Sequence, residues 1–288
     1  MESAERERSD LTLWQRFALR RLRKLAGRKA EEPLRPEDWE AVMRLHRQPI
    51  GRVAGRLFFA LPSSPRCGTC GAPFAGAGRF IVGPLGHRPS RKNPTMCATC
   101  VELSPPGGMT TQTGILFADI RGSTAQFDGR DPEQVSIVLR RFYRCAEDVL
   151  FPDAVIDKLI GDEVMALYLP EIKPNLSLTT IPTVMLEHAR ALLRGVGYGS
   201  GTPPFVEVGI GLDFGEAFVG NIGQRALYDF TAVGDVVNTA ARLQAHAAGG
   251  EIVLSERVAD WLPTPVGSRV QLTLKGKREP QTAYRVSL

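Results

Sequence analysis

Gly114-Ile-Leu-Phe-Ala-Asp119-Ile-Arg-Gly122-Ser-Thr124 is the stretch that decides how the chain is interpreted. An apolar run bounded by turn residues is typical of a buried strand, so Asp119 is expected where the strand leaves the core. The backbone amides around Gly122 can then approach an anion. A carboxylate beside such amides suits a hard cation that carries phosphates. Taken alone, the stretch is explained equally well by a strand that ends in a solvated aspartate.

A second segment places another aspartate at a turn. Asp157-Lys158-Leu-Ile-Gly161-Asp162-Glu163 lies between two short apolar runs. This pattern predicts a β-hairpin over residues 154–169 with Asp162 at its tip. Two aspartates at strand ends can share a pair of divalent ions, and two-metal sites catalyse in-line displacement at phosphorus.

A third segment predicts a helix with two polar residues on one face. It reads Tyr228-Asp-Phe-Thr231-Ala-Val-Gly234-Asp-Val-Val-Asn238-Thr-Ala-Ala-Arg242-Leu. Asn238 and Arg242 are four residues apart in a helical pattern and therefore share a face. Together, the three segments resemble the catalytic domain of the class III adenylyl and guanylyl cyclases, from about Gln112 to the C-terminus.

The resemblance implies a set of residues that act on ribose, phosphate and metal. Asp119 and Asp162 match the two metal-binding aspartates and are expected to hold two Mg²⁺ or Mn²⁺ ions, with a further oxygen from the Ile120 carbonyl. Asn238 matches the residue that orients the ribose. Arg242 matches the residue that neutralises charge on the α-phosphate.

Three lysine and threonine positions complete the expected nucleotide site. Lys158 and Thr231 match the base-selecting pair; lysine only donates and threonine can accept, which fits N1 and N6 of adenine. Lys275 is interpreted either as a contact to the terminal phosphates or as a solvated loop residue. The predicted function is an adenylyl cyclase that converts ATP to 3′,5′-cyclic AMP and pyrophosphate at a homodimer interface. The alternatives are guanylyl cyclase activity or a catalytically weak nucleotide-binding regulator.

Four cysteines predict a separate metal-binding module over residues 51–107. Cys67-Gly-Thr-Cys70 and Cys97-Ala-Thr-Cys100 are two Cys-x-x-Cys pairs, which is the ligand supply of a tetrahedral Zn²⁺ site. An iron–sulfur cluster uses the same ligands, and a redox role is a further alternative. His87, between the pairs, is interpreted as a loop residue and not as a fifth ligand. We expect a small zinc-ribbon-like module that regulates the catalytic domain.

The N-terminal segment, residues 1–50, is predicted to be helical and basic. Residues 10–26 combine an apolar stripe that includes Trp14 with surrounding arginines and lysines. Such a helix can pack on its own protein or on a second copy, lie at an anionic membrane surface, or enter a partner's groove. A second helix is expected over residues 35–47.

Charge and hydropathy restrict the classes of partner. Residues 1–112 contain 19 Lys and Arg against 10 Asp and Glu, whereas residues 113–288 contain 17 against 21, so the net charge of +5 comes from the N-terminal part. The basic part lacks the interleaved aromatic residues of a stacking platform, and nucleic acid is therefore not an expected partner. No transmembrane segment and no signal peptide is expected, which predicts a cytoplasmic protein.

The catalytic domain, residues 108–288, is predicted to be α+β and ferredoxin-like, with the helices on one face of the sheet. We expect helices over residues 131–149, 181–195 and 234–247 and strands over residues 113–119, 154–169 (a hairpin), 205–212, 216–221 and 251–254, followed by a C-terminal strand pair.

Overall fold

The computed structural model describes residues 11–45, 48–61, 65–90, 95–151, 153–173, 175–224 and 227–288. It divides into two compact units. The first unit comprises Met1–Thr110, Glu171–Pro174 and Phe218–Thr231, and the second comprises Thr111–Pro170, Asn175–Ala217 and Ala232–Leu288. The first residue of the predicted helix 10–26 and the last two residues of the predicted helix 35–47 lie outside the described residues. The domain boundaries expected near residues 50 and 107 remain predictions.

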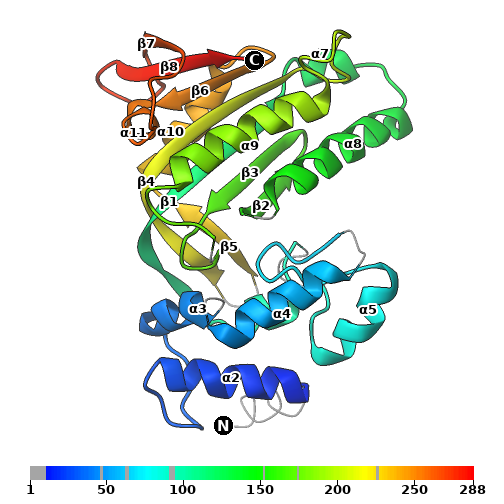
Figure 1. Ribbon diagram of the computed structural model, residues 1–288, viewed down its shortest axis with the longest axis vertical. Coiled ribbons are helices and arrows are strands. Elements are labelled where there is room, and N and C mark those ends of the chain that lie inside the picture. The colour runs from blue at the N-terminus through cyan, green and yellow to red at the C-terminus, as the bar shows by residue number, and fades with distance from the viewer. Residues whose placement is uncertain are drawn as a thin grey trace. The chain divides into compact units, whose positions relative to one another are not determined.

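The helices of the first unit are short and lie in its segment Met1–Thr110 (Figure 1). Helix α2 begins after Thr12, whose side chain accepts a hydrogen bond from the Gln15 amide, and its residues Ala18 and Leu22 are buried. Two apolar residues of its stripe thus pack within the unit, whereas Phe17 and Leu25 are exposed. None of the described helices is long and apolar enough to cross a membrane. The helices of this unit are α2 (Leu13–Leu25), η1 (Pro36–Asp38), α3 (Trp39–Leu45), α4 (Pro49–Ala60), α5 (Gly76–Val82), η2 (Gly83–Leu85) and α6 (Ala98–Val101).

The core of the second unit has the predicted ferredoxin-like order. The chain runs through β1 (Gly107–Ile120), α8 (Pro132–Leu150), β2 (Val155–Ile160), β3 (Glu163–Tyr168), α9 (Ile181–Val196) and β4 (Val208–Gln224). In the sheet these strands lie in the order β2-β3-β1-β4. This is the split β-α-β arrangement, in which β1 lies between the hairpin and β4. The α+β prediction is therefore confirmed.

The remaining elements extend this sheet. The full order is β2-β3-β1-β4-β6-β8-β7, and β5 pairs with β4 off this path. The strands expected over residues 205–212 and 216–221 form one continuous strand, β4, so the prediction of a break was wrong. Phe214, Ala217 and Val219 are all buried, which holds the chain extended through Gly215. The added elements are α7 (Ser123–Phe127), β5 (Leu227–Val233), α10 (Asp235–Ala245), β6 (Glu251–Ser255), α11 (Glu256–Ala259), β7 (Ser268–Leu272) and β8 (Gln281–Ser287).

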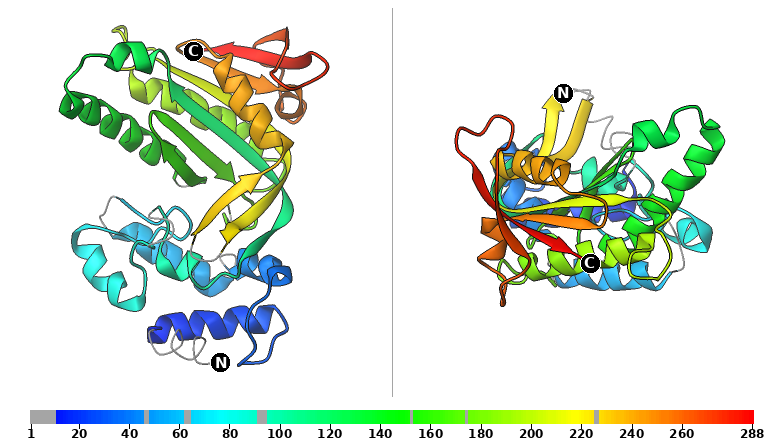
Figure 2. Two further views of the ribbon diagram at one scale, coloured as in Figure 1. Left: turned by 180° about the vertical axis from the view of Figure 1, so that it is seen from behind. Right: turned by 90° about the horizontal axis from the view of Figure 1, so that it is seen from above.

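Helices cover both faces of the sheet, not one face as the sequence suggested. On β6, Ile252 and Leu254 belong to the core cluster that contains α8 and α9. Val253, between them, belongs to a second cluster with Leu243 of α10. Because successive side chains of a strand point to opposite faces, α10 must lie across the sheet from α8 and α9. Figure 2 shows the orange α10 and the yellow-green α9 on opposite sides of the sheet.

The close approach of α10 to β4 depends on Gly211. A Cβ atom at this position would lie 2.3 Å from the carbonyl oxygen of Ala240 and 2.3 Å from the amide nitrogen of Gln244. Both are backbone atoms of α10, so the helix would have to move away from the sheet.

We expect Gly211→Ala to lower the free energy of unfolding by about 1–3 kcal/mol, the usual cost of overpacking. Urea denaturation of the purified protein measures it. Gly215→Ala is the matched control on the same strand, because its added Cβ would meet no atom nearer than 3.6 Å. Equal stability of the two variants would contradict the assigned contact.

Candidate functional site

Asp119 and Asp162 lie next to each other where β1 ends and where β2 turns into β3. The turn is made by Gly161, with φ of 62°, and Asp162. The amide of Ile120 donates to the carbonyl oxygen of Asp162 at 3.3 Å, and Asp119 lies opposite Glu163 in the β1–β3 register. The predicted strand end and hairpin tip therefore meet, and they bring three acidic side chains to one place.

The electrostatics of this site favour a bound cation. Burial raises the pKa of Asp119 to about 6, and the negative charge of Asp162 adds to that rise while Arg121 opposes it. Burial and the charges of Asp119 and Asp162 also raise the pKa of Glu163. Carboxylates that hinder each other's ionisation in a half-buried site become fully charged when a divalent cation neutralises them. The donor set, carboxylate and carbonyl oxygens, is also the one that Mg²⁺ and Mn²⁺ prefer.

Two residues that the sequence interpretation did not assign hold the Asp119 carboxylate. The guanidinium group of Arg121 pairs with Oδ2 of Asp119. Nε2 of Gln244 donates to the same oxygen at 3.2 Å. Arg121 stands two residues after Asp119 in the quoted stretch, so its proximity could have been inferred. Gln244 is distant in sequence, and no local pattern marks it.

The contact of Gln244 fixes how α10 is turned. Residues of an α-helix advance by about 100°, so Arg242 lies about 200° around the helix from Gln244, and Asn238 lies about 120° from it. Asn238 and Arg242 are about 40° apart and share a face, as predicted. Gln244 is buried toward Asp119, whereas Asn238 is exposed. The face with Asn238 and Arg242 is therefore turned away from the Asp119 carboxylate of the same chain.

Ion pairs anchor the N-terminal end of α10. Asp235, in its first turn, accepts from Nζ of Lys277 at 2.5 Å, and Lys277 lowers the pKa of Asp235. Arg257 pairs with the buried Asp213 of β4 at 2.5 Å and with Asp235 at 3.6 Å. The aspartate of the Gly234-Asp235 motif thus has a structural role at a helix start, where negative charge is favourable.

The turn after Leu274, which contains Lys275, approaches Arg242 at Gly276. Lys275 is exposed. Its neighbour Gly276 lies close to Arg242, since a Cβ there would be 3.3 Å from Nη2 of Arg242. A phosphate contact by Lys275 remains a prediction.

The proposed base-selecting residues lie on two different strands. Lys158 is in β2, and its side chain lies outside the described part of the structure. Thr231 is in β5 and is half-buried. Their pairing on a purine base remains a prediction.

The four cysteines of the first unit form one cluster. Their sulfur atoms all lie within 4.8 Å of one another. The Sγ atoms of Cys70 and Cys97 are 3.7 Å apart, and those of Cys67 and Cys100 are 4.0 Å apart. A tetrahedral ion with metal–sulfur bonds of about 2.3 Å requires sulfur separations of roughly 3.8 Å. The cluster therefore has the size of a single tetrahedral metal site.

His87 lies outside the helices and strands, as the loop prediction expected, but it is buried. It lies in the segment between the cysteine pairs, but it is 4% exposed, and its Nδ1 is 3.3 Å from Sγ of Cys97 and 3.8 Å from Sγ of Cys70. It does not belong to the group of mutually close ligand atoms, and whether it acts as a ligand stays a prediction. Its burial against the sulfurs was not foreseen, because the Gly- and Pro-rich segment around it has no apolar periodicity.

Comparison with known proteins gives one consistent family. Residues 108–287 match the model of the adenylate and guanylate cyclase catalytic domain. An adenylate cyclase of Anabaena cylindrica is 29% identical over 188 residues, which cover 62% of this chain and 37% of that protein. An uncharacterized protein of Mycobacterium tuberculosis is 32% identical over 138 residues, 48% of this chain and 24% of that protein. The chain thus matches well under half the length of these relatives.

Two solved structures share the fold. The crystal structure of a guanylyl cyclase is 28% identical, with a TM-score of 0.54, and covers 62% of this chain and 93% of that chain. The adenylyl cyclase CyaB of P. aeruginosa is 23% identical, with a TM-score of 0.56, and covers 62% and 95% of the two chains. Because CyaB is only 23% identical, its similarity to this chain concerns the fold alone.

Replacing Cys97 with Ser should remove the metal from the cysteine cluster. Structural zinc contributes roughly 10 kcal/mol or more to the folding of small modules, so residues 65–101 should lose protection from hydrogen exchange. The second unit has its own hydrophobic core and should keep its protection. Metal analysis of anaerobically purified protein and hydrogen exchange measure both effects.

Cys145→Ser is the matched control, because Cys145 is on α8 and outside the cluster. It should retain one ion per chain. Wild-type protein with neither zinc nor iron would contradict a metal site.

Proposed function

Because the chain belongs to the adenylate and guanylate cyclase catalytic domain family, we propose that it converts ATP to 3′,5′-cyclic AMP and pyrophosphate. The reaction takes place at two equivalent sites that two copies of the chain share. Asp119 and Asp162 of one copy hold two Mg²⁺ or Mn²⁺ ions. Asn238 and Arg242 of the other copy contact the ribose and the α-phosphate.

The orientation of α10 is the observation that supports a site shared between two copies of the chain. Gln244 faces Asp119 within one chain, and the helix turns Asn238 and Arg242 away from that carboxylate. A nucleotide bound to the metal aspartates of one chain is therefore contacted by the Asn238–Arg242 face of a second chain. A two-fold axis makes such an arrangement reciprocal, so each dimer has two sites.

Different residues of the chain contribute to different parts of the reaction. The ribose 3′-hydroxyl attacks the α-phosphorus, the bond to the β-phosphate oxygen breaks, and pyrophosphate leaves. When bound, the divalent ions lower the pKa of the attacking hydroxyl and neutralise the triphosphate. Asn238 orients the ribose for in-line attack, which removes an entropic cost from the barrier. Arg242 donates to the α-phosphate oxygens, whose charge grows in the transition state.

The cysteine module has a structural part in this proposal. Its four sulfurs hold one Zn²⁺, because an iron–sulfur cluster divides its cysteine ligands among two or more irons, so that some of them lie farther apart than the ligands of one ion. In this proposal the first unit, which contains the cysteine cluster, regulates the catalytic domain.

Complementation tests the shared site directly. Asp119→Asn and Arg242→Ala homodimers should each be nearly inactive with Mg²⁺ and ATP. Mixing the two chains in equal amounts should restore about a quarter of wild-type turnover, because half of the dimers are mixed and each has one intact site. Cyclic AMP formation measures the recovery.

The matched control mixes Asp119→Asn with Asp162→Asn. Both changes affect the same side of the site, so each site in the mixed dimer keeps one defect and no activity should return. Recovery in this control, or none in the first mixture despite confirmed mixed dimers, would refute the shared site.

Base choice follows from Lys158 and Thr231. Lysine can donate to N1 of adenine but would meet the N1 hydrogen of guanine, and sites built for one hydrogen-bond pattern reject the other. We expect ATP to be preferred over GTP by at least about tenfold in kcat/KM. Lys158→Glu combined with Thr231→Cys should raise the GTP to ATP ratio. A wild-type preference for GTP would overturn these two roles and leave the metal assignment standing.

A further inference from the structure

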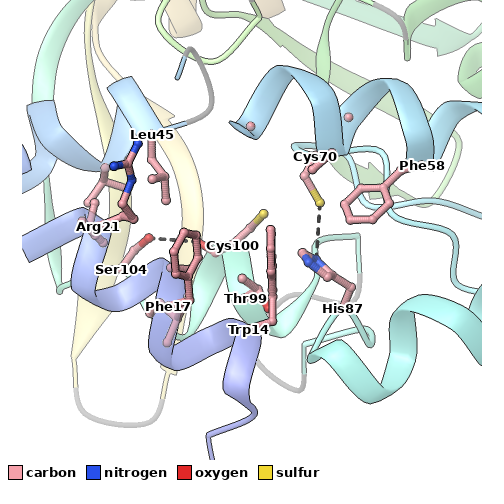
Figure 3. Close-up of a pocket in the computed structure, with 17 residues that line it drawn as sticks. Trp14, Phe17, Arg21, Leu45, Phe58, Cys70, His87, Thr99, Cys100 and Ser104 are labelled. Atoms are coloured by element: carbon pink, nitrogen blue, oxygen red, sulfur yellow. Dashed lines mark hydrogen bonds between the residues drawn. The ribbon is translucent and has the colours of Figure 1, made fainter. Parts of the chain in front are cut away.

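The first unit has apolar side chains in two different environments. Trp14 of α2 and Phe58 of α4, together with His87, line a cavity of about 80 Å³ beside the cysteine cluster (Figure 3). Phe80 and Ile81 of α5 do not line this cavity, and their side chains are 78% and 57% exposed. Neighbouring large apolar side chains that remain exposed mark a surface that interacts with a partner.

The geometry of α5 turns these side chains outward. Gly78 and Val82 are the buried residues of this helix. Because residues advance by about 100° around a helix, each of them lies about 160° from Phe80, which therefore points away from the buried side. Arg79 and Ile81 flank Phe80 to either side. A Cβ at Gly78 would lie 2.6 Å from a proline side chain of the same unit, so the buried side is closely packed and the helix cannot turn over.

The exposed surface continues from α5 into η2. Pro84 and Leu85 are exposed there, and the exposed Arg88 follows. None of the described residues forms an ion pair or hydrogen bond with the guanidinium group of Arg79 or Arg88. These residues together are named the α5 patch: Arg79, Phe80, Ile81, Pro84, Leu85 and Arg88.

The segment that contains the α5 patch has no acidic residue. Residues 41–101 contain nine Lys and Arg and no Asp or Glu, although the whole chain has 31 Asp and Glu in 288 residues. The α5 patch therefore combines large exposed apolar side chains with a segment whose side-chain charge is entirely positive.

This charge pattern distinguishes the partners that such a surface could bind. A two-fold contact between copies would place the same positive segment opposite itself, and like charges oppose such a contact. An anionic membrane instead attracts each lysine or arginine near its surface, by about fivefold in affinity per residue. The interfacial region of a membrane also accepts aromatic and aliphatic side chains, while arginine stems lie along them and the guanidinium groups reach phosphate.

We propose that the α5 patch is a docking site for an anionic phospholipid membrane. Phe80, Ile81 and Leu85 enter the boundary between headgroups and acyl chains, and Arg79 and Arg88 bind the lipid phosphates. One short helix buries little apolar area, so the attachment is reversible and requires both the apolar and the charged contribution. The proposal is independent of the cyclase reaction.

Co-sedimentation of the 288-residue chain with lipid vesicles, in the absence of nucleotide, tests the docking site. One set of vesicles is phosphatidylcholine alone, and the other contains about one third phosphatidylglycerol. We expect at least about tenfold tighter binding to the anionic vesicles. Raising the salt concentration from about 0.1 M to about 1 M should abolish most of this difference, because the Debye length falls from about 10 Å to about 3 Å.

Ile81→Ser tests the apolar contribution. It should weaken binding to the anionic vesicles by about fivefold, because an isoleucine side chain no longer leaves water when the patch docks. Ile137→Ser on α8 is the matched control, since Ile137 is 54% exposed and Ile81 is 57% exposed. The control should leave binding unchanged. Thermal melting curves verify that both variants are folded.

Arg79→Gln combined with Arg88→Gln tests the charged contribution. Loss of two cations from the α5 patch should weaken binding to the anionic vesicles by about 25-fold, at about fivefold for each. Arg140→Gln combined with Arg144→Gln removes the same charge from two exposed positions of α8. This control should change the affinity by less than about twofold, because it lies outside the docking site.

The proposal is overturned if the wild-type chain does not bind the anionic vesicles, or if the α5 and α8 variants bind them equally well. If Ile81→Ser leaves vesicle binding unchanged and lowers the molecular mass in analytical ultracentrifugation, the α5 patch is a contact between copies and not a membrane site. None of these results depends on whether the protein makes cyclic AMP.

Discussion

The packing of α10 on β4 at Gly211 is the constraint on which the catalytic part depends. A helix backbone can approach a strand this closely only where the strand has no side chain. The approach brings Gln244 within 3.2 Å of Asp119 and thereby fixes the rotation of the helix about its axis. The ion pairs of Asp235 with Lys277 and Arg257 hold the other end of α10. With both ends held, the face with Asn238 and Arg242 can point in only one direction.

The carboxylate cluster is the second determinant of the site. Asp119, Asp162 and Glu163 are held together by backbone pairing between β1 and β3, so their mutual repulsion cannot be relieved by separation. Arg121 supplies one positive charge, and the raised pKa of Asp119 shows that this does not fully compensate burial and the neighbouring carboxylates. A divalent ion has twice the charge in a smaller volume. The fold therefore supplies an arrangement whose electrostatic energy improves when such an ion binds.

The sequence predicted the elements that depend on local periodicity and turn chemistry. The β1 strand, the β2–β3 hairpin and helices α8, α9 and α10 all follow from apolar spacing and from Gly–Asp turns. The prediction divided β4 into two strands because glycine, here Gly215, is typical of turns. In the structure, burial of Phe214 and Ala217 keeps the backbone extended at this position. The position of α10 on the opposite face, and the contact of Gln244 with Asp119, depend on tertiary packing. No local pattern in the sequence specifies such packing.

In the first unit, one side chain contacts the cysteine cluster and lines the neighbouring cavity. Its helices are short, and one ion held by the four cysteines would supply order that so small a core cannot. His87 packs against the sulfurs through Nδ1 and lines the cavity with the same ring. The contact with the sulfur atoms therefore fixes the position of a ring that also forms part of the cavity wall.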